Sequence, residues 1–189
     1  MPLTEYDHVT TILDAWIDPE LLKWQLEVGR ATASKVSKKA MKIGSRVDEL
    51  IRADIDSGKL KLRKSDSNEV ANCMVGWEKF KKEKQMKVVS HHQRHQSEEW
   101  LVSGEYDLEY PLHMTDVKCA SAIRKKNWIQ TAVYNHISLL NKPKLAILRL
   151  DPFWATYEWK EKVMSVGYLK VFQGMIHVMR YFNCKEEFV

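Results

Sequence analysis

The chain has 189 residues, of which 44% are hydrophobic and 29% charged, as in ordinary soluble globular proteins. This length is enough for one domain with a buried core and short for two, so we expect a single domain over residues 1–189. No apolar run reaches the roughly 18 residues that a membrane span needs, and the N-terminus lacks the pattern of a secretory signal. We therefore expect neither a membrane span nor a secretory signal, and we expect an intracellular, cytoplasmic protein.

The cysteines and the net charge indicate the cellular compartment and the kind of partner. The chain has three cysteines, Cys73, Cys119 and Cys184. They lie far apart and lack the C-x-x-C spacing of zinc sites, and an odd number of such cysteines fits a protein in a reducing compartment. The net charge of +5 favours a polyanionic partner. The positive residues cluster in "KVSKKAMKIGSR", "KLKLRK", "KFKKEKQMK" and "IRKKNW". The alternative is that each run is a solvated helix face.

The first third of the chain has the spacing of amphipathic helices. Asp18 and Pro19 form a plausible cap and first turn, and Gly58 is a stop signal. We expect two helices between these signals, broken near Gly29 or Gly44. A polar loop should follow.

The remaining elements change from a helical period to a strand period. A third helix is expected over residues 69–85, with apolar positions every three to four residues at Val70, Cys73, Met74 and Trp77. Strands are then expected over 86–92, 98–110, 112–120 and 143–150, with helices over 127–141 and 166–182. Residues 1–87 should be mainly helical, and residues 88–189 should hold the sheet core and C-terminal helices.

The hairpin formed by the second and third of these strands carries an unusual set of charges. A two-residue turn at 110–111 would set Asp107 opposite Met114 and diagonal to Asp116. Because side chains alternate faces, Asp107, Asp116 and Lys118 share one face. The opposite face should pack into a core through Tyr106, Leu108, Val117 and Cys119.

Two carboxylates and an ammonium group at this spacing suit a hard divalent cation. Mg²⁺ takes oxygen ligands and is commonly held by one or two carboxylates plus phosphate oxygens of the substrate. Such an ion can polarise a phosphodiester, and the lysine adds positive charge where the transition state gains negative charge. The alternative is an exposed hairpin with an ordinary Asp/Lys pair.

The neighbouring residues resemble a known family. "GEYD", "DVK" and "QTAVY" follow the G-x-x-D strand, (D/E)-x-K strand and Q-x-x-x-Y helix of the RecB-like branch of PD-(D/E)XK nucleases, which includes lambda-type exonucleases. The last motif contains Gln130 and Tyr134, which are spaced i, i+4 on one helical face. The upstream segments "HVTTILDAW" and "GSRVDELI" are also similar to that family, so the resemblance spans roughly residues 8 to 180.

The chain departs from the family pattern in two places. The family's helix histidine falls on Asp48, counting four residues on from Gly44, and Glu49 sits beside it. Either carboxylate could be the helix-borne ligand, and we favour Asp48. Many relatives have a glutamate in the strand before the hairpin, where this chain reads "SHHQRHQ". His91 and His92 could approach the substrate or lie on the surface, and we favour the surface. The iron–sulfur cluster of some relatives needs four cysteines, so none is expected.

The resemblance implies an α/β fold with a PD-(D/E)XK nuclease-like core: a central mixed β-sheet flanked by helices, with a helical N-terminal part. It implies a Mg²⁺- or Mn²⁺-dependent deoxyribonuclease, an exonuclease or an enzyme that processes single strands or DNA ends in recombination, repair or replication. The catalytic residues would be Asp107, Asp116, Lys118, Gln130 and Tyr134. The metal ligands would be Asp107, Asp116, the backbone of Val117, and Asp48 or Glu49. The DNA contacts would come from Ser121, Arg124, Lys125 and Lys126.

Two other functions stay open from the sequence. One is a non-catalytic nucleic-acid-binding module on the same fold, and the other is a structural interaction domain. The sequence also does not distinguish exonuclease from endonuclease, DNA from RNA, or a monomer from a homo-oligomer.

Overall fold

The computed structural model describes residues 6–16 and 19–183, so the expectations for Asp18 and Cys184 lie outside the described residues. The N-terminal half contains β1 (Asp7–His8), α1 (Val9–Asp14), α2 (Pro19–Val28), α3 (Arg30–Ser57), α4 (Asn68–Lys84) and β2 (Ser90–Ser97). The C-terminal half contains β3 (Val102–Glu109), β4 (His113–Cys119), α5 (Lys125–Ile137), β5 (Lys144–Leu150), β6 (Tyr157–Val163) and α6 (Val166–Asn183). None of the described helices has the length and apolar character that crossing a bilayer would take.

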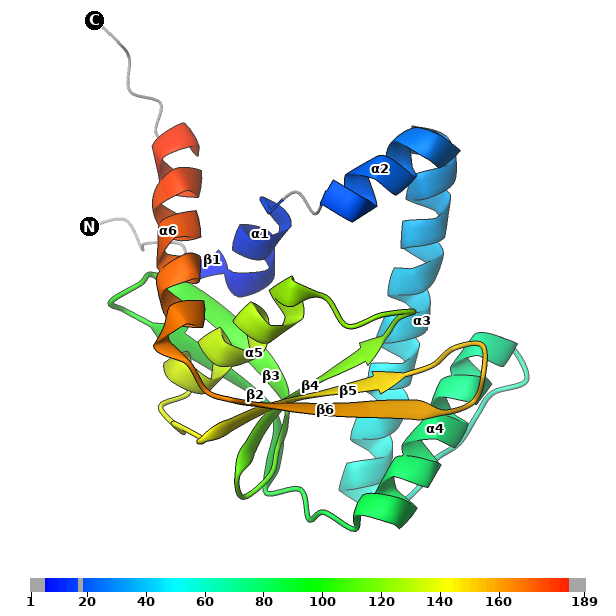
Figure 1. Ribbon diagram of the computed structural model, residues 1–189. Coiled ribbons are helices and arrows are strands. Elements are labelled where there is room, and N and C mark those ends of the chain that lie inside the picture. The colour runs from blue at the N-terminus through cyan, green and yellow to red at the C-terminus, as the bar shows by residue number, and fades with distance from the viewer. Residues whose placement is uncertain (1–5, 17–18, 184–189) are drawn as a thin grey trace, which may run out of the picture.

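The strands form one mixed sheet in the order β1-β3-β4-β5-β6, with β2 also paired to β3 (Figure 1). The pairs β2–β3 and β3–β4 are antiparallel, so the predicted hairpin is confirmed and β2 extends it to a three-stranded meander. The pair β4–β5 is parallel and is joined through α5, because parallel strands need a long crossover. The strand pairing therefore changes from antiparallel to parallel at β4, the strand that carries the D-x-K motif.

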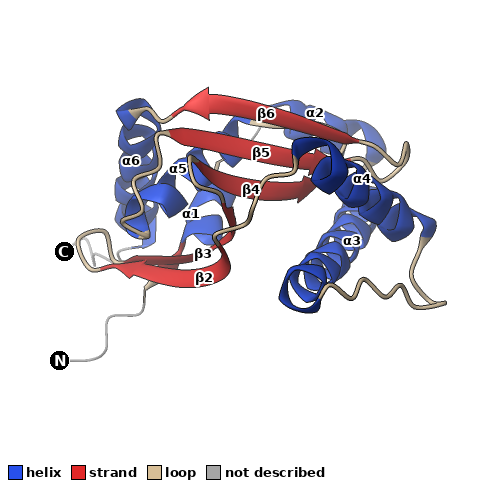
Figure 2. Ribbon diagram, turned by 90° about the horizontal axis from the view of Figure 1, so that it is seen from below, coloured by secondary structure: helices blue, strands red, loops and turns tan. Residues whose placement is uncertain are grey.

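Helices cover both faces of this sheet, as predicted. In Figure 2, α1, α5 and α6 gather at one end of the view and α3 and α4 at the other. The first group packs on strand residues such as Leu145 and Ile147, and the second packs on Leu148 and Leu150. These β5 side chains alternate between two hydrophobic clusters, as expected for a strand buried on both faces.

The predicted helix boundaries in the N-terminal half are largely confirmed. The break between the first two long helices falls at Gly29, whose φ of 81° suits glycine, and Gly44 lies inside α3. Gly58 ends α3 in the left-handed conformation with φ 64°. The four apolar positions predicted for α4 are all buried. α3 thus runs unbroken from the helical part down to the sheet (Figure 1).

Several strand predictions were wrong. The strand expected over 86–92 is β2 at Ser90–Ser97, a polar strand whose described neighbour is β3 alone. β1, the short α1 and β6 were not predicted as separate elements. Polar edge strands lack the apolar alternation on which the prediction rested, and pairing with the neighbouring strand determines them instead.

The hairpin turn also differs from the prediction. The reciprocal backbone bonds between Tyr110 and His113 make 111–112 the two turn residues. Glu109 therefore pairs with Met114 and Leu108 with Thr115, which shifts the register from the predicted one.

The face opposite the acids is only partly as predicted. Leu108, Val117 and Cys119 pack in the cluster under α3 and α4, whereas Tyr106 packs in the cluster under α5. Cys73 and Cys119 are both free thiols.

The close packing of α4 on the sheet gives a stability test. A Cβ at Gly76 would lie 2.6 Å from the backbone oxygen of Thr156, whereas a Cβ at Gly44 in α3 would meet nothing within 4 Å. Gly76→Ala should lower the free energy of unfolding by about 1–3 kcal/mol because backbone must shift. Gly44→Ala, the matched control, should raise it by about 0.5–1 kcal/mol through helix propensity. Urea denaturation of both variants measures the free energy of unfolding. Equal effects in the two variants would contradict the close contact of Gly76 with the backbone of Thr156.

Candidate functional site

The centre of the site is formed by side chains from β3 and β4. Asp116 is 1% exposed, and its Oδ1 accepts a hydrogen bond from Lys118 Nζ at 2.7 Å. Asp107 Oδ2 accepts from the Val117 backbone N–H at 2.6 Å. Asp107, Asp116 and Lys118 therefore lie close together, next to the point where the regular pairing of β3 and β4 ends.

The charges of Asp107, Asp116 and Lys118 do not balance. Burial, followed by the charge of Asp116, raises the pKa of Asp107 to about 7. Burial also raises the pKa of Asp116, although Lys118 opposes this effect. For Lys118, burial lowers the pKa but the two carboxylates raise it more, so the amine stays protonated. One ammonium group therefore serves two buried acids.

The helix α3 and the strand β2 add two more side chains. His92 Nε2 lies 2.7 Å from Asp48 Oδ1, and ligand atoms of Asp48, His92 and Asp107 all lie within 4.8 Å of one another. The assignment of His92 to the surface was wrong, because its side chain is only 5% exposed. His91 is also largely buried and lies beside Asp56. A histidine pair in the strand where many relatives have a glutamate was the available signal.

Glu49 lies away from this group. Its side chain is 55% exposed and pairs with Arg46 at 2.8 Å and with Arg63 at 3.0 Å. The structure thus brings Asp48, and not Glu49, to the acids of the hairpin. The flanking residues Val47 and Ile51 are buried and fix this orientation of α3.

The helix α5 brings the Q-x-x-x-Y residues beside the hairpin. Gln130 Nε2 donates to the Tyr134 hydroxyl at 2.9 Å, so both lie on one helical face as predicted. The Tyr134 ring packs so closely on β3 that a Cβ at Gly104 would lie 2.4 Å from its Cε1. Burial raises the pKa of Tyr134, which therefore stays a neutral hydroxyl. The close approach explains why the G-x-x-D motif needs its glycine.

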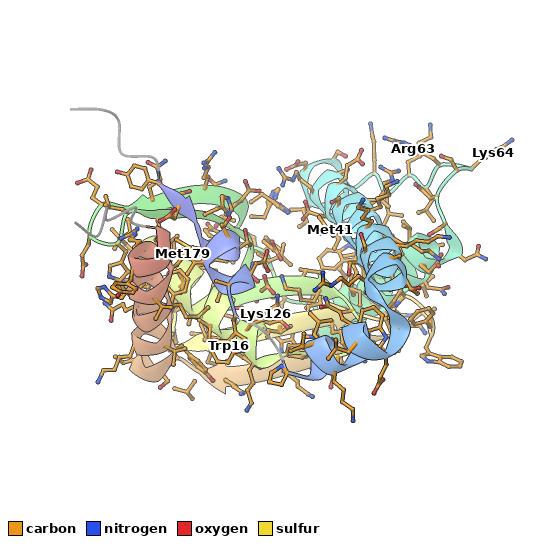
Figure 3. All side chains as sticks on the ribbon, turned by 90° about the horizontal axis from the view of Figure 1, so that it is seen from above. Trp16, Met41, Arg63, Lys64, Lys126 and Met179 are labelled. Carbon is orange, nitrogen blue, oxygen red and sulfur yellow. The ribbon has the colours of Figure 1, made fainter. Side chains whose placement is uncertain are left out.

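The predicted DNA-binding residues lie around the start of α5. Ser121 is exposed, and Arg124, Lys125 and Lys126 line a depression together with Trp16. Figure 3 labels Trp16 and Lys126 close to each other. Lys126 Nζ also pairs with Asp14 at 3.3 Å. Trp16, which the sequence analysis did not single out, adds an aromatic side chain to this basic surface.

The residues present fit a divalent cation. Among the described residues, Asp116 Oδ2 has no hydrogen-bond partner although it is buried. A buried carboxylate oxygen without a donor is costly unless a cation satisfies it. Asp48, His92 and Asp107 offer two oxygen ligands and one nitrogen ligand in one compact group. Carboxylate and imidazole groups are common protein ligands of divalent metals.

Comparison with solved structures places the fold. No protein-family model and no curated protein matches the chain. A proposed exonuclease from Eubacterium rectale is similar with a TM-score of 0.59 and 16% identity, over 97% of this chain and 84% of that one. An alkaline exonuclease from Laribacter hongkongensis is similar with a TM-score of 0.52 and 7% identity, over 95% and 88%. The same enzyme in complex with dAMP gives the same TM-score of 0.52.

These likenesses extend over nearly the whole chain, with covered shares of 97% and 95%. They include the mixed sheet and the helices on both of its faces. The chain therefore has the fold of these exonucleases, and the nuclease-like α/β fold predicted from the motifs is confirmed.

The contrast between the two neighbouring acids of α3 can be tested by metal binding. Asp48→Ala should weaken Mn²⁺ binding at least about tenfold, because it removes a carboxylate from the compact group. Glu49→Ala is the matched control and should leave binding nearly unchanged, because Glu49 pairs with arginines outside the group. Isothermal titration with Mn²⁺ measures the affinity of both variants and so shows which of the two acids binds the metal. Loss of binding in Glu49→Ala alone would mean that the helix faces the site differently.

Proposed function

We propose that the chain is a divalent-metal-dependent deoxyribonuclease that hydrolyses phosphodiester bonds, and that it acts on DNA ends or single strands. The observation that carries this proposal is the arrangement of Asp107, Asp116 and Lys118 on β3 and β4, facing Asp48 from α3. Acids and one amine at this spacing suit phosphodiester hydrolysis and have no evident role in a binding module. The solved structures of similar fold, which are exonucleases, support the proposal.

Asp107, Asp116 and Asp48 would hold Mg²⁺ or Mn²⁺, together with the backbone carbonyl of Val117. When bound, the ion would polarise the scissile phosphate and lower the pKa of the attacking water. The buried setting increases the effect of each charge, because little water screens it. The protein's role is to keep these oxygen atoms fixed on β3, β4 and α3.

Lys118 would act as a positive charge and not as a base. Its ammonium group is fixed by Asp116 at 2.7 Å, and the two carboxylates raise its pKa, so it has no free lone pair to accept a proton. It would donate hydrogen bonds to the attacking water or to a phosphate oxygen. Negative charge that develops on the phosphate in the transition state would then be stabilised.

Gln130 and Tyr134 would position the substrate. The Gln130 amide donates to the Tyr134 hydroxyl, which leaves the hydroxyl proton free to bond a phosphate oxygen. The ring of Tyr134 is fixed against Gly104, so the hydroxyl has little freedom to move. A donor held in this way can orient the scissile phosphate or a strand end.

DNA would bind across the basic surfaces around the start of α5 and on α3. Arg124, Lys125 and Lys126 surround the start of α5, where the helix dipole also favours phosphate. The exposed residues Lys38 and Lys42 add positive charge in the N-terminal half of α3, the helix that extends beyond the sheet in Figure 1. Contacts of this kind go to the phosphate backbone and carry little sequence information.

The reaction itself provides the first test. Linear duplex, circular and single-stranded DNA, each labelled, should be cut with Mg²⁺ or Mn²⁺ and left intact with EDTA, because the acids alone repel phosphate. Ca²⁺ should support binding with little cleavage, since its looser geometry positions water poorly. Cleavage of linear but not circular DNA would identify an exonuclease. Cleavage that persists in excess chelator would refute the proposal.

The role of Lys118 provides the second test. Lys118→Ala should lower the cleavage rate at least about a hundredfold, while DNA binding with Ca²⁺ changes much less. Lys64→Ala is a matched control with the same change of charge, because Lys64 is exposed and lies far from the site at the outer edge of Figure 3. Its cleavage rate should stay near that of the wild type. Equal losses of binding and cleavage in Lys118→Ala would make Lys118 a phosphate anchor.

A further inference from the structure

Two histidines of β2 form a chain of contacts that ends in the candidate site. His91 Nε2 lies 3.0 Å from Asp56 Oδ1, and His91 Nδ1 lies 2.9 Å from His92 Nδ1. His92 Nε2 in turn lies 2.7 Å from Asp48 Oδ1. Both ends of this chain are carboxylates, which accept hydrogen bonds and do not donate them when ionised.

A count of protons shows that one of these contacts lacks a proton. A neutral imidazole has one N–H donor and one acceptor nitrogen, so two of them supply two protons for three contacts. If His91 donates to Asp56 and His92 donates from Nδ1 to His91, then His92 Nε2 presents a lone pair to the Asp48 carboxylate at 2.7 Å. If His92 donates from Nε2 to Asp48 instead, the two Nδ1 atoms face each other with lone pairs at 2.9 Å. In the first arrangement, the facing lone pairs of His92 and Asp48 repel each other unless a third proton lies between them or both atoms coordinate one metal cation.

The surroundings favour a metal cation. Asp107 offers a further oxygen within 4.8 Å of both groups. On the neighbouring strand, the buried Asp116 Oδ2 has no hydrogen-bond partner among the described residues. One added proton at His92 would leave that oxygen unsatisfied, whereas a divalent cation can balance several carboxylates at once.

The backbone directs the ring into this position. His92 has a φ of 50°, which non-glycine residues rarely adopt, in the middle of a strand whose neighbours His91 and Gln93 pair regularly with β3. This local turn of the backbone brings the ring beside α3, where Asp48 lies.

We propose that His92 Nε2 is a direct ligand of the divalent cation, and that this nitrogen ligand makes the site prefer Mn²⁺ over Mg²⁺. His91 and Asp56 are positioning residues that keep the proton of His92 on Nδ1. The proposal rests on the metal site of the proposed function, and it adds a ligand from β2 and a metal preference. The chain would thus place on a strand the nitrogen ligand that the resembling family has on its helix.

The metal preference follows from ligand chemistry. Mg²⁺ takes oxygen ligands almost exclusively and keeps much of its water, whereas Mn²⁺ accepts imidazole nitrogen beside carboxylates. The second nitrogen of a ligating histidine usually donates to a fixed acceptor, which raises the basicity of the ligand. Here His91 Nδ1, which lies 2.9 Å from His92 Nδ1, would be that acceptor. A site with one nitrogen and two or more carboxylates should therefore bind Mn²⁺ at least about tenfold more tightly than Mg²⁺.

The test uses the whole chain with Mn²⁺ alone and Mg²⁺ alone, without DNA. Isothermal titration gives the two affinities, and pulsed electron paramagnetic resonance of bound Mn²⁺ reports whether a nitrogen nucleus is directly coordinated. The wild type should show nitrogen coupling. His92→Glu should lose this coupling while it still binds Mn²⁺, and its Mn²⁺-to-Mg²⁺ preference should fall at least about tenfold. His91→Ala should keep the coupling but weaken Mn²⁺ binding about tenfold or more.

His95→Gln is the matched control, because His95 lies on the same strand but stacks on Tyr106 at 5.6 Å. Its nitrogen coupling and affinities should equal those of the wild type. Wild-type protein that binds Mn²⁺ without nitrogen coupling would overturn the proposal and leave the proposed nuclease function standing. Wild-type protein that binds neither ion would overturn both. The spectrum of the wild-type protein tests whether a nitrogen ligand is present, even if His92→Glu fails to fold.

Discussion

The structure depends on an imbalance of buried charge. Asp107 and Asp116 are held on adjacent strands at the centre of the sheet, and Lys118 is the one ammonium group among the described residues that faces both. Burial of like charges is unfavourable, and the pKa of about 7 at Asp107 expresses that cost. The surrounding elements are arranged so that a bound cation would relieve it. A fold that keeps this strain gives up some stability to keep a site ready for ligand.

The residues nearest the chemistry were the easiest to predict from the sequence. Asp116 and Lys118 share a face in any strand, because alternation needs no knowledge of the partner strand. Gln130 and Tyr134 share a face in any helix for the same reason. Helices on both sides of the sheet were also expected, because the family that the motifs resemble has them. The predicted roles of these residues remain proposals.

Other features depend on contacts between distant segments. The register of the hairpin is set by which two residues form the turn, and Pro111 fits a turn at 110–111 as well as one at 111–112. β2 has a polar sequence, so its position follows from pairing with β3 and not from its own pattern. The position of His92 depends on a backbone conformation and on docking of α3, and His92 lies 44 positions after Asp48 in the chain. Local sequence patterns do not predict a contact between segments so far apart in the chain.

The outer strand β6 has a consequence for how copies of the chain can associate. Among the described strands, β5 is its one neighbour, so its other edge carries unpaired backbone groups. This edge bears alternating charges, including Glu158 and Lys160, which pair with each other at 2.7 Å. Charged side chains along an edge discourage a second sheet from extending the ladder. The sheet should therefore end at β6 within each subunit, and a second copy of the chain should not extend it along this edge.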